Sequence, residues 1–129
     1  MAIDRQDQLY IVDMTGRIQV FTADGKYLRG WRTPESTNGK PTGLSFDQQG
    51  NLMVADTHYF RILFYTPQGR LLDDQTIGGK YGFGPSEFTL VTDCAQDSQG
   101  NYYVSEYGEY DRIQKFSPQR KFLFQWGGH

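Results

Sequence analysis

The sequence predicts an all-β fold made of three similar four-stranded units. Three observations predict it: one strand pattern recurs three times, short strands alternate with turns that contain Gly or Pro, and helical periodicity is nearly absent. The composition agrees, because 16% of the residues are aromatic, with nine Tyr and nine Phe. Aromatic side chains pack well on the pleated surface of a sheet.

The recurring pattern is a strand that ends in an acidic residue, followed by a second strand that begins with Arg-Ile. The first strand occupies 8–13, 51–56 and 101–106, and the second occupies 17–21, 61–65 and 112–116. Asp13 and Asp56 are 43 positions apart. A period of this length indicates an array in which each unit covers its apolar faces against its neighbours. We therefore divide the chain into units 2–40, 41–87 and 88–129.

The middle copy shows the four strands of a unit most clearly. In order, we expect an innermost strand at 41–47, a second at 51–55, a third at 61–65 and an outer strand beginning at 70–72. Gln48-Gln49-Gly50 and Thr66-Pro67-Gln68-Gly69 supply the turns between them. Asp73 and Asp74 are expected to continue the outer strand on its solvent side.

One turn of the third copy departs from its siblings. Gln119-Arg120 stands where the other copies have Asp24-Gly25 and Gln68-Gly69. An Arg held at positive φ would be strained by about 1 kcal/mol. We therefore expect this turn to adopt a different shape.

Charge and apolar patterning narrow the class of protein. The formal charge is −2, from 13 basic and 15 acidic residues, so no global field favours nucleic acid or anionic lipid. No apolar run approaches the roughly 20 residues of a membrane span, and the first residues lack the pattern of a signal peptide. The compartment is not predicted. Cys94 is the single cysteine and is expected to be a buried, inert thiol.

The blade pattern resembles the NHL repeat of β-propellers. Residues 41–69 read Pro-x-Gly, then Gly-Asn-x-x-Val-Ala-Asp, then Arg-Ile-x-x-Phe/Tyr and a closing turn with Gly, and 100–116 match almost as well. The resemblance implies blades of four antiparallel strands, three per chain, in rings that usually have six blades. Two departures are His58-Tyr59-Phe60, where the family often has Gly-Asn-His, and Asp93 in place of the equivalent of Gly43.

The outer copies look incomplete at their outer edges. Ala2-Ile3-Asp4 aligns with Ser45-Phe46-Asp47, and Gly127-Gly128 stands where a further linker would begin. We expect a fragment of a longer propeller, natural or engineered, with an open blade face at each end. A homodimer would complete a six-bladed ring, and a homotrimer would give nine blades. The predicted seam residues are Ala2, Ile3, Phe122, Phe124 and Trp126.

The acid and the Arg of each copy are predicted to form a structural ion pair. The ends of hairpin strands are neighbours, so the pairs are Asp13 with Arg17, Asp56 with Arg61, and Glu106 with Arg112. The alternative is a ring of Arg side chains that binds an anion near one face.

The loops on the same rim are the candidate face for a ligand or protein partner, with a plain surface loop as the alternative. Tyr offers a broad contact area and a polar tip. The candidate residues are His58, Tyr59, Asp93, Tyr107, Glu109 and Tyr110.

We predict a non-enzymatic structural or interaction protein with no catalytic residues, metal site or cofactor. The resemblance also implies alternatives, since related amidating lyases use a metal with several His residues, and lactonase-type propellers use acidic and Asn ligands. Only His58 and His129 are present here, 71 positions apart. Some NHL domains bind single-stranded RNA. Arg29, Trp31 and Arg32 form the only notable basic and aromatic cluster for that role.

Overall fold

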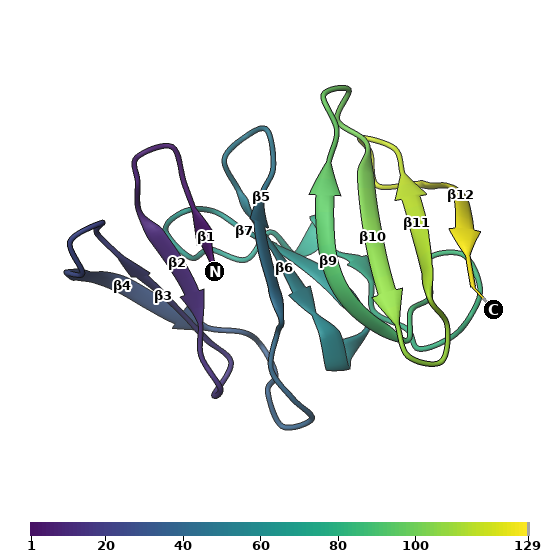
Figure 1. Cartoon of the computed structure of the whole chain (residues 1–129), viewed down its shortest axis with the longest axis horizontal. Helices are drawn as coiled ribbons and strands as arrows, with labels where there is room; N and C mark the ends of the chain where they lie inside the picture. Colours follow the sequence, from purple (N-terminus) through teal and green to yellow (C-terminus); the bar gives the residue numbers. More distant parts are fainter. Residues whose placement is uncertain (129) are drawn as a thin grey trace.

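Three four-stranded antiparallel sheets lie side by side in the computed structural model, which describes residues 1–128 (Figure 1). Blade 1 contains β1 (Ala2–Ile3), β2 (Leu9–Val12), β3 (Arg17–Phe21) and β4 (Tyr27–Arg32). Blade 2 contains β5 (Gly43–Phe46), β6 (Leu52–Asp56), β7 (Arg61–Tyr65) and β8 (Ile77–Gly78). Blade 3 contains β9 (Leu90–Gln96), β10 (Tyr102–Tyr107), β11 (Arg112–Phe116) and β12 (Phe122–Gly127). Neighbouring strands pair in chain order within every sheet, which confirms the predicted fold class.

Two short 3₁₀ helices interrupt the strands, and one of them corrects an expectation. Asp73 and Asp74 belong to the helix η2 (Asp73–Gln75) and not to the outer strand. This turn allows both Leu72, before it, and Ile77, after it, to pack into the core beside blade 3. The other helix is η1 (Thr57–Tyr59). Neither helix of the described residues is long and apolar enough to cross a membrane.

Blade 2 is covered on both faces, whereas blades 1 and 3 are covered on one. All five residues of β6 are buried. In β10 and β11, buried residues alternate with half-buried ones, because successive side chains of a strand point to opposite faces. One apolar cluster fills the space between blades 1 and 2, and a second fills the space between blades 2 and 3.

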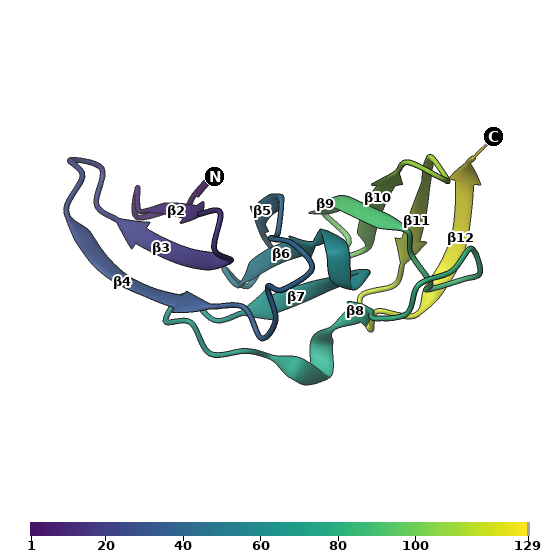
Figure 2. The same cartoon turned by 90° about the horizontal axis from the view of Figure 1, so that it is seen from below.

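We call the side of a blade that points to the following blade its forward face, and the opposite side its rear face. The forward face of blade 1 supplies Tyr10, Ile18 and Val20 to the first cluster, and that of blade 2 supplies Met53, Ile62 and Phe64 to the second. Two faces have no neighbouring blade among residues 1–128, as the open ends of the arc show (Figure 2). The open rear face of blade 1 carries Leu9, Ile11, Gln19 and Phe21, and the open forward face of blade 3 carries Tyr103, Ser105, Ile113 and Lys115.

Blades 2 and 3 approach most closely at their innermost strands. The Ser45 hydroxyl donates to the Cys94 carbonyl at 2.5 Å. A Cβ atom at Gly43 would lie only 2.5 Å from the Thr92 carbonyl oxygen, so this position requires glycine. The same position of blade 3 is Asp93, which therefore could not make the same close approach to a following blade.

The turn at Arg120 corrects the second expectation. Arg120 donates its backbone N–H to the Ser117 carbonyl, as Gly25 donates to Thr22 and Gly69 to Thr66. Arg120 has a φ of 63°, in the left-handed region where Gly25 and Gly69 also lie. The turn therefore keeps the shape of its siblings, and the Arg carries the backbone strain.

Relief of that strain should be measurable. We expect Arg120→Gly to raise the free energy of unfolding by up to about 1 kcal/mol, because glycine tolerates positive φ while losing more chain entropy on folding. The matched control is Gly25→Ala at the equivalent turn, where a Cβ atom would meet nothing within 4 Å. That change should lower the free energy by about 1 kcal/mol. Urea unfolding of both variants measures this, and a destabilised Arg120→Gly protein would contradict it.

Candidate functional site

The structure brings together the acid and the Arg of all three predicted pairs. The distance from the Arg Nε atom to the nearest carboxylate oxygen is 3.0 Å for the Arg17–Asp13 pair, 2.8 Å for Arg61–Asp56 and 2.7 Å for Arg112–Glu106. Burial distinguishes the pairs. The Arg side chain is 47% exposed in blade 1, 17% in blade 2 and 0% in blade 3.

The pair in blade 3 is the centre of a buried polar network. The Arg112 guanidinium also donates to the carbonyl oxygens of Phe83 at 2.5 Å and Glu87 at 2.8 Å. Gln114 donates to the Glu87 carbonyl and to Glu106, and Thr89 donates to Glu106 through its backbone N–H and its hydroxyl. The network therefore fixes the linker 79–88 against the rim of blade 3.

The pair in blade 2 holds the preceding linker in a similar way with fewer contacts. Arg61 Nη2 lies 3.1 Å from Glu35 of the linker 33–41, as an ion pair outside hydrogen-bonding geometry. The second oxygen of Asp56 has no donor among the described residues. Asp56 is one methylene shorter than Glu106, and Leu63 stands where blade 3 has Gln114. Burial raises the pKa of Asp56, although the Arg61 hydrogen bond opposes this.

These contacts favour the structural interpretation of the pairs over the anion site. The Arg112 side chain is fully buried, and its Nε, Nη1 and Nη2 atoms all donate to protein oxygens. Arg61 is held by two carboxylates. Only Arg17 is accessible enough to meet an added anion, and its Nε already donates to Asp13.

The six residues of the predicted partner face do not form one site. Tyr59 accepts the Asn38 backbone N–H at 2.9 Å, and its ring lies 5.2 Å from the Arg61 guanidinium. His58 lies against Gly39, where a Cβ atom would collide with the imidazole. Both residues therefore contact the linker between blades 1 and 2.

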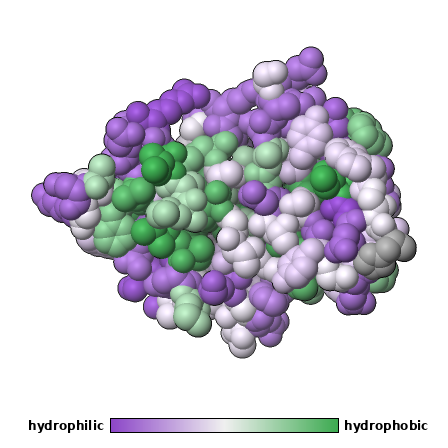
Figure 3. All heavy atoms as spheres, in the orientation of Figure 1, coloured by the Kyte–Doolittle hydropathy of each residue, from purple (hydrophilic) through white to green (hydrophobic). Residues whose placement is uncertain are grey.

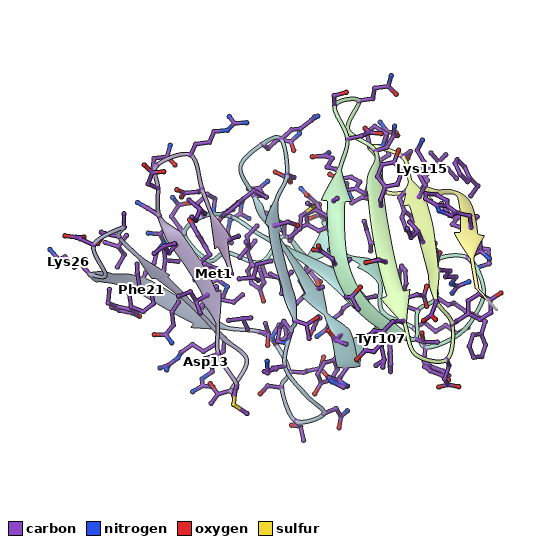
Figure 4. All side chains as sticks on the ribbon, viewed as in Figure 1. Met1, Asp13, Phe21, Lys26, Tyr107 and Lys115 are labelled. Atoms are coloured by element: carbon purple, nitrogen blue, oxygen red, sulfur yellow. The ribbon has the colours of Figure 1, made fainter. Side chains whose placement is uncertain are left out.

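Tyr107, Glu109 and Tyr110 lie at the rim of blade 3 instead. Tyr107 lies toward the same edge of the arc as Asp13, and Lys115 toward the opposite edge (Figure 4). Glu109 accepts the Tyr81 hydroxyl at 2.8 Å, and the Tyr110 ring lies 5.5 Å from the Phe83 ring. Sequence reasoning missed Tyr81 and Phe83. The signal was the alternation of aromatic residues with Gly in the linker 79–88.

Asp93 lies apart from both loop groups, on the open forward face of blade 3. Its side chain is exposed and lines a shallow cavity of about 180 Å³ with Tyr103, Ser105 and Ile113. Its Oδ1 atom accepts the Cys94 backbone N–H. Among residues 1–128, no group of three or more His, Cys, Asp or Glu side chains is placed to hold a metal ion. His129 lies outside the described residues.

The predicted seam residues divide between the inside and the outside of the arc. Ile3, Phe124 and Trp126 are 60%, 51% and 45% exposed, and Phe124 and Trp126 lie on the forward side of β12. Ala2 and Phe122 need correction. Ala2 packs against the cluster between blades 1 and 2, and Phe122 against the cluster between blades 2 and 3.

The basic and aromatic cluster is also part of a contact between blades. Arg29 donates to the Pro67 carbonyl at 2.8 Å and to the Tyr10 hydroxyl at 2.9 Å. The Trp31 ring packs 5.6 Å from the Tyr65 ring. Of the three residues proposed for RNA contact, only Arg32 remains exposed.

Three turn aspartates differ in the environment of one oxygen atom. Asp4, Asp47 and Asp97 each accept backbone N–H groups two and four residues later. The second oxygen of Asp4 accepts from Tyr10, and that of Asp97 from Tyr103. The equivalent of these tyrosines in blade 2 is Met53, and Asp47 Oδ2 has no donor among the described residues.

The missing hydroxyl changes the electrostatics of that carboxylate. Burial raises the pKa of Asp47 above its ordinary value of 3.8. For Asp97, burial is outweighed by hydrogen bonds from Asn101, Tyr103 and Gln99, which lower the pKa to about 2. Burial also raises the pKa of the Cys94 thiol, which is 2% exposed, so the thiolate is disfavoured.

No family model matches the chain. A curated relative, the peptidyl-glycine alpha-amidating monooxygenase of Mus musculus, is 33% identical over 90 residues, which cover 67% of this chain and 9% of the relative. The chain thus spans about a tenth of the length of the curated relatives that it matches.

Solved structures establish the fold. The virginiamycin B lyase of Staphylococcus aureus superposes with a TM-score of 0.70 at 12% identity, covering 97% of this chain and 39% of that one. The WD40 domain of Neurospora crassa Pan2 gives 0.70 at 10% identity, covering 99% and 37%. The three sheets of this chain are therefore blades of a β-propeller.

Burial should decide how much each ion pair contributes to stability. We expect Arg112→Met to lower the free energy of unfolding by about 3–5 kcal/mol, because it leaves the Glu106 carboxylate buried without its cation. Arg17→Met removes the equivalent, exposed cation and should cost less than about 1 kcal/mol. Chemical denaturation of both variants tests this. Equal losses at the two positions would show that burial does not govern the contribution.

The pKa values of Asp47 and Asp97 should be shifted in opposite directions. Carboxyl ¹³C NMR should give Asp47 a pKa above 3.8 and Asp97 one of about 2. The folded pKa of Asp47 is raised, so its contribution to stability is present below 3.8 and is lost as the pH rises through the folded value. Asp47→Asn should therefore be tolerated better, relative to the parent protein, at neutral pH than at acid pH. A pKa for Asp47 below that of Asp97 would contradict this.

Proposed function

We propose that this chain is a non-enzymatic interaction scaffold, whose two open blade faces join a second copy to close a ring of six blades. The carrying observation is that the open faces use the same strand positions that form the contact between blades 1 and 2 and the contact between blades 2 and 3. Leu9, Ile11 and Phe21 of blade 1 correspond to Leu52, Val54 and Tyr65 of blade 2, which are all buried against blade 1. The partner's blade 3 would cover them in the same manner.

The rear face of blade 1 supports association by its apolar character. A green, hydrophobic area extends over the β1 and β2 region (Figure 3). Ile3 is 60% exposed there, and Leu9 and Ile11 are half-buried. Large contiguous apolar patches on a protein surface mark association sites. The Asp13–Arg17 pair lies on the same side, accessible to solvent where its two counterparts are covered by a linker.

The amount of surface does not by itself demand a partner. The accessible area is 6917 Å², close to the roughly 7,000 Å² expected for a folded monomer of 14.9 kDa. The argument for association therefore rests on the identity of the exposed side chains.

Blade 3 makes its open face more polar than the inner forward faces. Lys115 stands where blades 1 and 2 have Val20 and Phe64, and Asp93 stands at the position that requires Gly43 between blades 2 and 3. The Lys115 ammonium lies over the rings of Tyr103 and Phe124, at 5.3 Å and 5.4 Å. Because a seam must desolvate these charges, we expect a reversible dimer that dissociates on dilution.

Within the propellers, the repeat pattern supports an NHL-type blade. The second candidate function is that of a metal-dependent enzyme, which the identity to the amidating monooxygenase favours. Metal analysis of the purified protein, together with a binding assay for added Zn²⁺, separates this candidate from the scaffold.

Solution mass tests the scaffold proposal. Light scattering over a dilution series should give two chains at high concentration and one after dilution, and Phe124→Asp should shift the transition to at least about tenfold higher concentration. Met14→Asp is the control, because it introduces the same charge at an apolar side chain that is 85% exposed in the loop between β2 and β3. Circular dichroism verifies that each variant is folded. A single-chain mass at all concentrations would overturn the proposal, and three chains would replace the six-bladed ring by nine blades.

A further inference from the structure

A second group of exposed aromatic rings lies on the linker that enters blade 3 and at the end of β10. Tyr81, Phe83 and Tyr107 are 47%, 46% and 52% exposed. Ring contacts connect them to the body of the protein, from Phe60 to Tyr81 at 5.3 Å, from Tyr81 to Phe83 at 6.0 Å and from Phe83 to Tyr110 at 5.5 Å. We call the linker 79–88 with the loop 107–111 the aromatic rim.

The aromatic rim is rigidly held from inside. Arg112 donates to the carbonyl oxygens of Phe83, Gly84 and Glu87, so the backbone of the linker turns its acceptors toward the buried guanidinium. The rings of Tyr81 and Phe83 remain on the outside of the same segment. A ring on a backbone that is already fixed loses less conformational entropy when a partner binds it than a ring on a mobile loop does, and this favours an interface hot spot.

The charges on the aromatic rim are predominantly acidic. Within 79–88 and 107–111 the acidic residues are Glu87, Glu109 and Asp111, and the basic residue is Lys80, which pairs with Glu87 at 3.1 Å. Arg112 is buried and neutralised by Glu106. Glu109 lies beside the Tyr81 ring, because it accepts the Tyr81 hydroxyl. A cation placed over the Tyr81 ring would thus be near the Glu109 carboxylate.

We propose that the aromatic rim binds a segment of another protein through an Arg or Lys side chain seated on the Tyr81 and Phe83 rings. The chain already uses this interaction internally. The Arg61 guanidinium lies 5.2 Å from the Tyr59 ring, and that of Arg112 lies 4.9 Å from the Tyr110 ring. Attraction between a cation and an exposed ring strengthens binding by about two- to fivefold, and a neighbouring carboxylate adds to it.

Charge favours a basic peptide over a nucleic acid at this surface. Stacking of bases on Tyr81 and Phe83 would bring phosphates close to Glu87, Glu109 and Asp111. Binding of single strands generally combines aromatic platforms with a positively charged groove. The aromatic rim has the rings, but its residues 79–88 and 107–111 include three acidic side chains and one basic side chain.

The probe is a short fluorescein-labelled peptide of alternating Gly and Arg, with its Gly-Glu counterpart as the charge control. Fluorescence anisotropy at low salt should detect binding of the Arg peptide only. The double variant Tyr81→Ala, Phe83→Ala should weaken that binding about tenfold, through the loss of two cation–ring contacts. Glu109→Gln should weaken it less and reduce its salt dependence. Met14→Ala, a change at another exposed apolar side chain, should leave it unchanged.

Each other outcome contradicts the proposal. Absence of binding overturns it, as does equal binding of the Arg and Glu peptides or Arg-peptide binding that the double variant retains. Tighter binding of oligouridine that depends on Tyr81 and Phe83 would assign the surface to RNA. Thermal unfolding verifies that the double variant is folded, and a mass measurement in the same buffer shows whether self-association is unaffected.

Discussion

The structure depends on the requirement that a sheet with two apolar faces be covered on both. Blade 2 satisfies it completely, since Val54 and Leu63 contact blade 1 while Met53 and Phe64 contact blade 3. The outer blades satisfy it on one face each. Close packing between sheets makes the central blade the most constrained part of the chain. The properties of each open face depend on which residues the outer blade has at the positions that are buried in blade 2.

The buried acid–Arg pairs supply what apolar packing cannot, which is a fixed path for the chain between blades. A linker passes over the rim of the blade that it enters, where its carbonyl groups need donors once they are removed from water. Arg112 satisfies several carbonyl groups of the linker 79–88 at once, whereas Arg61 makes a single ion pair with Glu35. The entry to blade 3 is thus the more rigid of the two, and it is also where aromatic rings are displayed on the outside.

The repeat made the fold and the ion pairs predictable from sequence, because equivalent residues occupy equivalent positions in every blade. Reasoning from single copies was less successful where tertiary contacts decide. The strand expected at Asp73 and Asp74 is a helical turn because Leu72 and Ile77 must both reach the core. Arg29 and Trp31 looked like a surface cluster, but the neighbouring blade buries much of them. The exposure of Tyr81 and Phe83 could not be predicted, since it follows from the long-range hydrogen bonds of Arg112.

The open blade faces and the aromatic rim are therefore two different kinds of surface. The open faces of blades 1 and 3 are core positions without a neighbour, and a partner there must resemble another blade. Lys115 and Asp93 disfavour a permanent contact at the forward face of blade 3, because both charged side chains would have to lose their water there. The inner blades have uncharged residues at these positions, with Val20 and Phe64 in place of Lys115 and Gly43 in place of Asp93. Within the aromatic rim, Phe88 belongs to the core between blades 2 and 3, whereas Tyr81 and Phe83 are not core positions. The hydrogen bonds of Arg112 go to backbone carbonyl groups of the linker and do not involve the Tyr81 and Phe83 rings. The shape of a propeller therefore does not account for the exposure of these two rings, which the proposed binding of a partner would explain.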